Sequence, residues 1–356
     1  MTKEKPTIRD IASNLNVSAA TVSRALRDAG KVSEKLRHRI IDEAEKIGYK
    51  PNFAAKALRN QSSQLIGLII SNFFSFQIDE LVSHIQSYAE QQQYGIILGV
   101  TQWDTEHEIQ QMDFMVNKRV DGIIIKSKGL HESIDKIQKV ALEGTPVVSL
   151  LDKMNIPNVN SVLVDNVTGG YLATKYLLQK GHRNILYVTY KQAQSTVGND
   201  SHFSRERYFG LLRAHAEMNT LRPDGLVFYD PSSCEDNDTE GCFREYFRKN
   251  KNYTAIFAYD DQIAAGIARA IKAEGYKIPE DFSIIGFDDS ALVNKWSTPA
   301  ITVVKQPDKQ VAYEAVNLIT NRKNFSSITD HNPYLCPELI ERDSVRDISK
   351  KCENYL

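Results

Sequence analysis

The sequence lacks several features that would place it in a familiar class. No run of about 18 apolar residues occurs, which excludes a transmembrane helix. The N-terminus, Met-Thr-Lys-Glu-Lys-Pro, is polar and has no signal-like apolar region, so we expect a cytoplasmic protein. The four cysteines form no CxxC pair and no histidines stand at metal spacing, which indicates reduced thiols, no metal site and no cofactor.

The net charge of −1 hides an uneven distribution along the 356 residues. Residues 1–60 contain 13 lysines and arginines against 7 acidic residues, a net charge of +6, which leaves −7 on the rest of the chain. A basic head on an acidic body is the electrostatic pattern of a protein that binds a polyanion. The length suits a small module followed by a core of two lobes.

Residues 7–26 read TIRDIASNLNVSAATVSRAL and predict a helix-turn-helix unit. Apolar residues recur at helical spacing in two short stretches, which begin at the capping residues Thr7 and Ser18. A third amphipathic stretch follows a cap at Ser33 and ends at Gly48. The first fifty residues are therefore expected to form a three-helix headpiece.

The outward face of the second helix has the residue types that the major groove of DNA requires. Ala19 and Ala20 are small enough for close approach, Thr21 and Ser23 can donate to phosphates, and Arg24 can bridge a guanine edge. The alternative is a generic three-helix bundle with a solvated polar face. The combination of small residues, hydroxyls and one arginine favours DNA binding.

Residues 51–60, PNFAAKALRN, predict a helix of about two turns, a length that is marginal in water without a packing partner. Such a segment is expected to fold only when something packs on it, as a switchable hinge requires. A plain linker helix is the alternative.

Beyond residue 64, apolar runs rich in β-branched residues alternate with amphipathic helical stretches, which is typical of parallel sheets covered on both faces. Leu339 and Ile340 are expected on an edge strand. The first four strands are expected in one lobe and the next five in a second. The strands are expected at 65–70, 94–98, 122–125, 146–150, 161–164, 185–190, 226–229, 255–258, 282–286 and 301–304. The expected helices include those at 78–92, 106–117, 133–143, 167–180, 205–217, 262–274 and 308–320.

Ligand sites in open α/β sheets lie beyond the carboxyl ends of the strands. Aromatic residues there can stack on a sugar or a base, carboxylates accept bonds from hydroxyl pairs, and arginine donates in a fork. We expect Asp288 as the main hydroxyl acceptor and Asp260 as the second, with Asp261 and Asp289 as helix caps. The residues expected to contact a small molecule are Phe73, Phe74, Phe76, Lys126, Arg205, Asp260 and Asp288.

Paired carboxylates could instead hydrolyse glycosides. However, the sequence has no nucleophile–base pair, no G-x-S-x-G motif and no Walker motif, so an enzyme is not expected.

The strings TIRDIASNLNVSAATVSRAL and GYKPNFAAKALRN resemble the lactose/galactose repressor (LacI/GalR) family of bacterial transcription factors, and the resemblance extends from Thr7 to Arg342. It implies that Leu58 opens a base step in the minor groove and that Ala55 pairs the two hinge helices of a dimer. It also implies that Arg205 contacts an effector, with Arg207 as a structural neighbour. The residues expected to contact DNA are Thr7, Ser18, Ala19, Ala20, Thr21, Ser23, Arg24, Lys31, Ser33, Asn52, Ala55 and Leu58.

The resemblance also implies the domain organisation, an α/β fold in which the headpiece and hinge helix precede a two-lobed core like that of periplasmic binding proteins. The head is expected at 1–50, the hinge at 51–62, the core at 63–345 and a tail at 346–356. Lobe 1 is expected at 63–162 and 305–330, and lobe 2 at 163–304 and 331–345. Three crossovers are expected to join the lobes, with the ligand between them.

The expected function is a nucleoid-associated homodimeric repressor of carbohydrate-utilisation genes that binds a palindromic double-stranded operator and is switched by a sugar. A purine effector or a phosphorylated protein as corepressor is the alternative on the same fold. A solute-binding protein without gene regulation would not need the basic head, and a purely architectural DNA binder would not need the polar strand ends.

Overall fold

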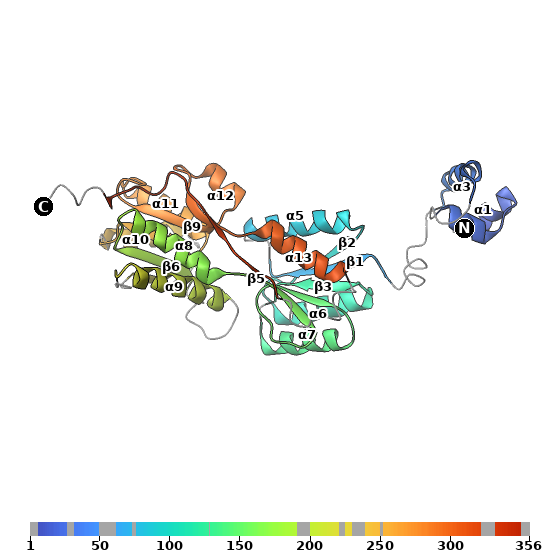
Figure 1. Ribbon diagram of the computed structural model, residues 1–356, viewed down its shortest axis with the longest axis horizontal. Helices are drawn as coiled ribbons and strands as arrows, with labels where there is room; N and C mark the ends of the chain where they lie inside the picture. The colour runs from blue at the N-terminus through green and yellow to red at the C-terminus, as the bar shows by residue number, and fades with distance from the viewer. Residues whose placement is uncertain are drawn as a thin grey trace. The chain divides into compact units, whose positions relative to one another are not determined.

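The computed structural model describes residues 6–26, 32–49, 62–72, 76–127, 129–190, 200–220, 225–229, 239–249, 252–321 and 332–349. The chain divides into two compact units, Met1–Ser63 and Gln64–Leu356 (Figure 1). Among the residues described, no helix is long and apolar enough to cross a membrane.

The first unit holds three short helices, α1 (Ile8–Leu15), α2 (Ala19–Ala25) and α3 (Glu34–Lys46). Both the backbone N–H and the hydroxyl of Thr7 donate to the carboxylate of Asp10, at 2.7 and 2.8 Å, which fixes the start of α1. The hydroxyl of Ser18 accepts from the N–H of Thr21 at 3.1 Å and caps α2. Ser33 stands at the N-cap of α3 without a capping side-chain bond. The three helices share a core of Ile11, Ala12, Val22, Ala25, Ile40 and Ala44.

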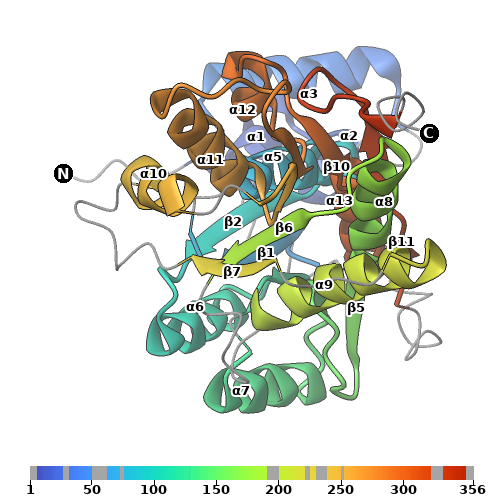
Figure 2. The ribbon, with the colours of Figure 1, turned by 90° about the vertical axis from the view of Figure 1, so that its left-hand side faces the viewer.

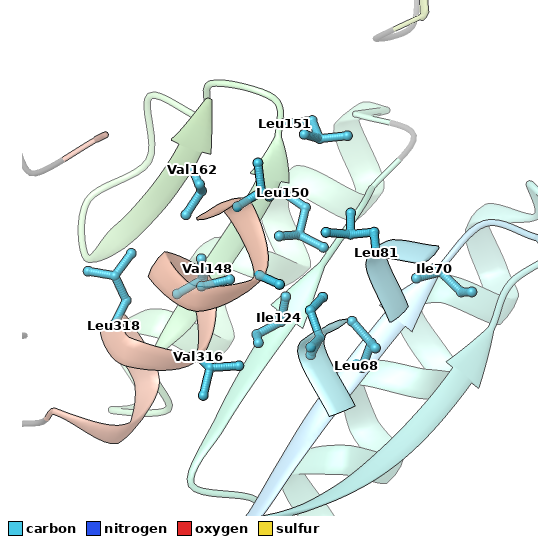
Figure 3. Packing of buried hydrophobic residues seen from close by; sticks show 14 of the residues in the cluster. Leu68, Ile70, Leu81, Ile124, Val148, Leu150, Leu151, Val162, Val316 and Leu318 are labelled. Atoms are coloured by element: carbon cyan, nitrogen blue, oxygen red, sulfur yellow. The ribbon is translucent and has the colours of Figure 1, made fainter. Parts of the chain in front are cut away.

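The second unit contains two six-stranded sheets. The first sheet has the order β11-β5-β4-β3-β1-β2, and all its pairings are parallel. Helices α5 and α13 cover one face, where β-branched and leucine side chains interlock (Figure 3), and α6 and α7 cover the other. The strands are β1 (Leu65–Ile70), β2 (Gly95–Val100), β3 (Gly122–Ile125), β4 (Val147–Leu151), β5 (Val159–Val164) and β11 (Tyr334–Leu335). The helices are α5 (Phe76–Gln91), α6 (Thr105–Asn117), α7 (His131–Leu142) and α13 (Asp308–Thr320).

The second sheet has the order β12-β10-β9-β8-β6-β7, and β12 is an antiparallel edge strand, as expected from Leu339 and Ile340. Helices α10 and α11 pack on one face, and α8 and α9 on the other (Figure 2). The strands are β6 (Ile185–Tyr190), β7 (Leu226–Tyr229), β8 (Ala255–Ala258), β9 (Ser283–Asp288), β10 (Thr302–Lys305) and β12 (Glu338–Ile340). The helices are α8 (Asn166–Gln179), α9 (Asp200–Glu217), α10 (Thr239–Lys249), α11 (Asp261–Ala273) and α12 (Ala291–Trp296).

The chain crosses between the two lobes three times: after β5, after β10 and after β11. Two expectations about the lobes are wrong. The strand expected at 161–164 is β5 and belongs to the first sheet, because it pairs with β4 along its length. Tyr334 and Leu335 pair with β5, so this part of the segment 331–345 belongs to the first lobe rather than to the second.

Helices α8 and α9 approach closely because each has a glycine where it contacts the other. A side-chain carbon at Gly170 would collide with the backbone carbonyl of Arg207, and one at Gly210 would collide with that of Val167. This close approach fixes the position of Arg207 relative to the start of α8, where Asn166 lies.

The expectation of four reduced thiols is wrong for Cys242, which lies in α10 and is disulfide-bonded. Cys336 is a free, exposed cysteine.

Candidate functional site

One face of α2 is open to solvent and carries the residues predicted to read DNA. Ser18, Ala19, Ala20 and Arg24 are exposed, whereas Val22 is buried against the other two helices. The Nε of Arg24 donates to the carbonyl of Ala20 at 3.3 Å, so its guanidinium lies along this face. The face therefore offers a small apolar leading end followed by a fork of donors, the arrangement that fits a major groove.

The other predicted DNA contacts lie around this face or outside the described residues. Thr7 and Ser33 are exposed, while Thr21 and Ser23 are half-buried. The hydroxyl of Thr21 is within 2.8 Å of that of Ser18, so it supports the cap as well as facing outward. The remaining four predicted contacts lie outside the described residues; they are Lys31, Asn52, Ala55 and Leu58.

In the second unit, Arg207 of α9 is the centre of a buried polar arrangement. Its side chain is only 4% exposed, and its guanidinium carbon lies 3.5 Å from the ring centre of Phe287 and 4.4 Å from that of Tyr259. Its Nε donates to the side-chain oxygen of Asn166 at 3.0 Å, and an Nη donates to the carbonyl of Tyr259. The planar cation is thus held between two aromatic rings with its donors directed sideways.

Asp288 ends β9 and faces this arginine. It is 9% exposed, its Oδ1 lies 3.8 Å from an Nη of Arg207, and it accepts from the amide of Gln306 at 2.6 Å. Its backbone is left-handed, with φ of +94°, which only a few residue types adopt without large strain. Burial raises the pKa of Asp288, while Arg207, Gln306 and Lys126 act in the opposite direction.

Asp260 follows β8 and caps α11, accepting from the N–H of Ile263 at 2.7 Å. Burial, and next the charge of Asp288, raise the pKa of Asp260 to about 6. The hydroxyl of Tyr190 also donates to this carboxylate. Burial and the charge of Asp288 likewise raise the pKa values of Asp261 and Asp308 well above their ordinary value.

The first lobe contributes Lys126, which follows β3 and is 8% exposed. Its ammonium lies 5.8 Å from the ring centre of Trp103 and 5.6 Å from that of Phe203 on α9, within the range of a cation–π interaction. We call Lys126, Arg207, Asp260, Asp288 and Gln306 the interlobe cluster, because they meet where the carboxyl ends of strands from both sheets converge.

The structure places Arg207, rather than Arg205, in this cluster, and the contact of Arg205 with an effector stays a prediction. Helix α9 begins at Asp200, five residues before its predicted start, and positions 205 and 207 point about 200° apart on a helix. Arg205 is exposed, whereas Arg207 faces Asp288. The pattern that could have revealed this is the buried stripe of Phe203, Leu211 and Ala214, which shares a face with Arg207.

The predicted caps also need correction. Asp260, rather than Asp261, caps α11, and Asp261 accepts from the N–H of Ser290 at 2.6 Å. Ser290, rather than Asp289, stands at the N-cap of α12, and Asp289 pairs with Arg342 at 2.5 Å and Lys305 at 3.1 Å.

The predicted aromatic contacts Phe73 and Phe74 lie outside the described residues, and Phe76 is described only as the first residue of α5. Sequence reasoning missed Gln306, Asn166 and Tyr190, because single polar residues at strand ends carry no pattern. Among the described residues, no cluster of histidine, cysteine or acidic side chains could hold a metal ion.

The chain is similar to known proteins in both of its units. A family model described as "Bacterial regulatory proteins, lacI family" matches residues 7–52, and a "Periplasmic binding protein-like domain" model matches residues 174–345. The HTH-type transcriptional regulator RegA of Clostridium saccharobutylicum is 30% identical over 338 residues, which cover 95% of this chain and 98% of RegA. The chain belongs to the LacI family of bacterial regulatory proteins. It is a DNA-binding transcriptional regulator of that family rather than an enzyme.

Solved structures of similar fold include two transcriptional regulators that hold ligands. The lac repressor dimer bound to operator and the anti-inducer ONPF has a TM-score of 0.81 at 23% identity, covering 96% of this chain and 100% of that chain. The CelR–cellobiose complex has a TM-score of 0.65 at 22% identity, with the same coverage of 96% and 100%. At these identities the likeness establishes the fold of a LacI-family regulator.

The raised pKa of Asp260 predicts a pH-dependent stability. Because the folded pKa of about 6 exceeds the ordinary 3.8, its contribution is fully present below pH 3.8 and is lost as pH rises to 6. Asp260→Asn keeps the cap and removes the ionisation, so at pH 7 it should stabilise the protein by roughly 1–3 kcal/mol and at pH 4 by much less. Urea unfolding at both pH values measures this. The control, Asp260→Ala, loses the helix cap at both pH values. An Asp260→Asn variant that is less stable than the wild type at pH 7 would contradict the raised pKa of Asp260.

The position of Arg24 predicts a base-specific role. Arg24→Ala should lose about 1–3 kcal/mol of affinity for an operator selected from random sequences, and should lose less for operators altered at one guanine per half-site. Arg24→Lys keeps the positive charge but loses the two-pronged donor arrangement of the guanidinium. It should therefore retain the sequence-independent, electrostatic part of the operator affinity and lose the preference for the guanine. Fluorescence anisotropy with single-base operator variants measures both. Equal weakening on every sequence would show that Arg24 contacts a phosphate instead.

Proposed function

We propose that this regulator is a repressor of carbohydrate-utilisation genes whose effector is a small sugar bound at the interlobe cluster. The observation that carries the proposal is the buried Arg207, which pairs with Asp288 and whose guanidinium stacks on the rings of Phe287 and Tyr259. A sugar presents adjacent hydroxyls that both donate and accept, and apolar ring faces. A carboxylate and a guanidinium fork match the hydroxyls.

Residues from both lobes form the cluster. A ligand bound there would therefore contact both lobes, which supports the proposal that it changes their relative orientation. Lys126 comes from the first lobe, and Arg207, Asp260 and Asp288 come from the second. The cellobiose held by the similar CelR structure supports the sugar class. A ligand that contacts both lobes favours the closed arrangement by its differential affinity for the two states.

Effector binding is proposed to change the affinity of the headpiece for DNA. We propose a homodimer on a palindromic operator, in which Ala55 pairs the hinge helices and Leu58 opens a central base step. When the effector repositions the lobes, the two hinges separate, the minor-groove contacts are lost and operator affinity falls. The basic head, with its net charge of +6 over residues 1–60, supports the non-specific part of this binding.

Thermal unfolding of the full chain across mono- and disaccharides, sugar phosphates and purines tests the proposal. A sugar at about a hundred times its Kd should stabilise the protein by roughly 2.7 kcal/mol, which is a readable rise in Tm. Asp288→Asn should abolish that rise, since the amide replaces one of the two accepting oxygens with a donor and removes the negative charge, but tolerates the left-handed backbone.

The matched control is Asp289→Asn, because the neighbouring carboxylate is also left-handed, with φ of +70°, but pairs with Arg342 and Lys305. It should leave the sugar-dependent rise intact. A rise produced by a purine alone would refute the sugar. A rise that survives in Asp288→Asn would place the ligand elsewhere. A panel without any response would contradict a small-sugar effector and point to a partner protein as corepressor.

A further inference from the structure

One aromatic side chain of the second lobe is built into the core of the first. Phe203 lies in α9, yet it belongs to the hydrophobic cluster of the first sheet, α5 and α13, and is only 6% exposed. Tyr259, which follows β8, is partly buried against the same cluster as well as against that of its own lobe. Since hydrophobic clusters generally mark one lobe's interior, these two residues are shared between the lobes.

Phe203 also contacts the polar side of the interlobe cluster. The ammonium of Lys126 lies 5.6 Å from its ring centre, so a first-lobe cation rests on a second-lobe ring. Residues 203 and 207 are one helical turn apart and share a face of α9. Arg207 in turn stacks on Tyr259, the other shared residue. A single face of α9 therefore links first-lobe packing to the arginine that pairs with Asp288.

We propose that Phe203 is a positioning residue that locks the lobes together and brings Lys126 to Arg207 and Asp288. Its ring fills a site in the first lobe, and burial of that ring favours the closed arrangement without any ligand. Removal of the ring lowers the population of the closed arrangement. The apparent affinity of any ligand that needs both lobes falls by the same factor. The inference deepens the proposed effector site and rests on it for its functional meaning.

A backbone amide provides a direct measure of this closure. Ala291 is the first residue of α12 in the second lobe, and its N–H donates to the carboxylate of Glu80 on α5 of the first lobe at 2.8 Å. An N–H in the first turn of a helix has no intrahelical partner, so this bond across the lobes is what slows its exchange. Hydrogen exchange at Ala291 therefore reports whether the lobes are closed.

The experiment measures hydrogen exchange at Ala291 in the full chain, without effector or DNA. Phe203→Ala should exchange several-fold faster than the wild type and approach the rate of Glu80→Ala, which lacks the acceptor. Phe203→Leu, which keeps most of the apolar volume and should fold if the alanine variant does not, should show a smaller change in the same direction. Phe209→Ala on the same helix, where the ring is 58% exposed, should behave as the wild type.

An unchanged rate at Ala291 in the Phe203 variants, with faster exchange confined to β4 and β5 of the first lobe, would overturn the inference. Phe203 would then fill a local gap without holding the lobes together. Because no ligand enters the measurement, this failure is distinguishable from a failure of the sugar proposal.

Discussion

The buried pair of Arg207 and Asp288 is the interaction on which the rest of the second unit depends. Two charges removed from water are favourable only when further partners satisfy them. Asn166 and the carbonyl of Tyr259 satisfy the guanidinium, and Gln306 satisfies the carboxylate. These partners come from the start of α8, the end of β8 and the crossover after β10. The pair therefore ties the end of β8 to two of the segments at which the chain passes between the lobes, the start of α8 and the crossover after β10.

The surrounding backbone is shaped to hold this pair. Gly170 and Gly210 let α8 and α9 approach until a Cβ would collide, and this places Arg207 beside Asn166. Asp288 and Asp289 are both left-handed and bond in different directions, one to Gln306 and the other to Arg342. Strain in two consecutive residues persists only where several contacts hold it, and such positions cluster at ligand sites.

Much of the fold could be predicted because its patterns are periodic. The expected strands appear with ends shifted by at most two residues, and Thr7 and Ser18 lie at the N-caps of their helices. The residues of the site were harder to predict than the fold, because their role depends on which side of a helix each residue faces. Arg205 and Arg207 differ by two positions, and only the apolar stripe shared with Leu211 separates them. The places of Gln306 and Asn166 in the site depend on tertiary proximity that no local pattern encodes.

Short elements such as α12 and β11 were not predicted, because they are held by contacts from distant segments.

A double-mutant cycle across the central pair tests the account most directly. The free energy of unfolding in urea would be measured for the wild type, Arg207→Gln, Asp288→Asn and the double variant. If the two side chains depend on one another, the losses should be non-additive, with a coupling of about 1–3 kcal/mol. Losses that add to within roughly 0.3–0.5 kcal/mol would contradict the account, because the two residues would then be independent occupants of the same region.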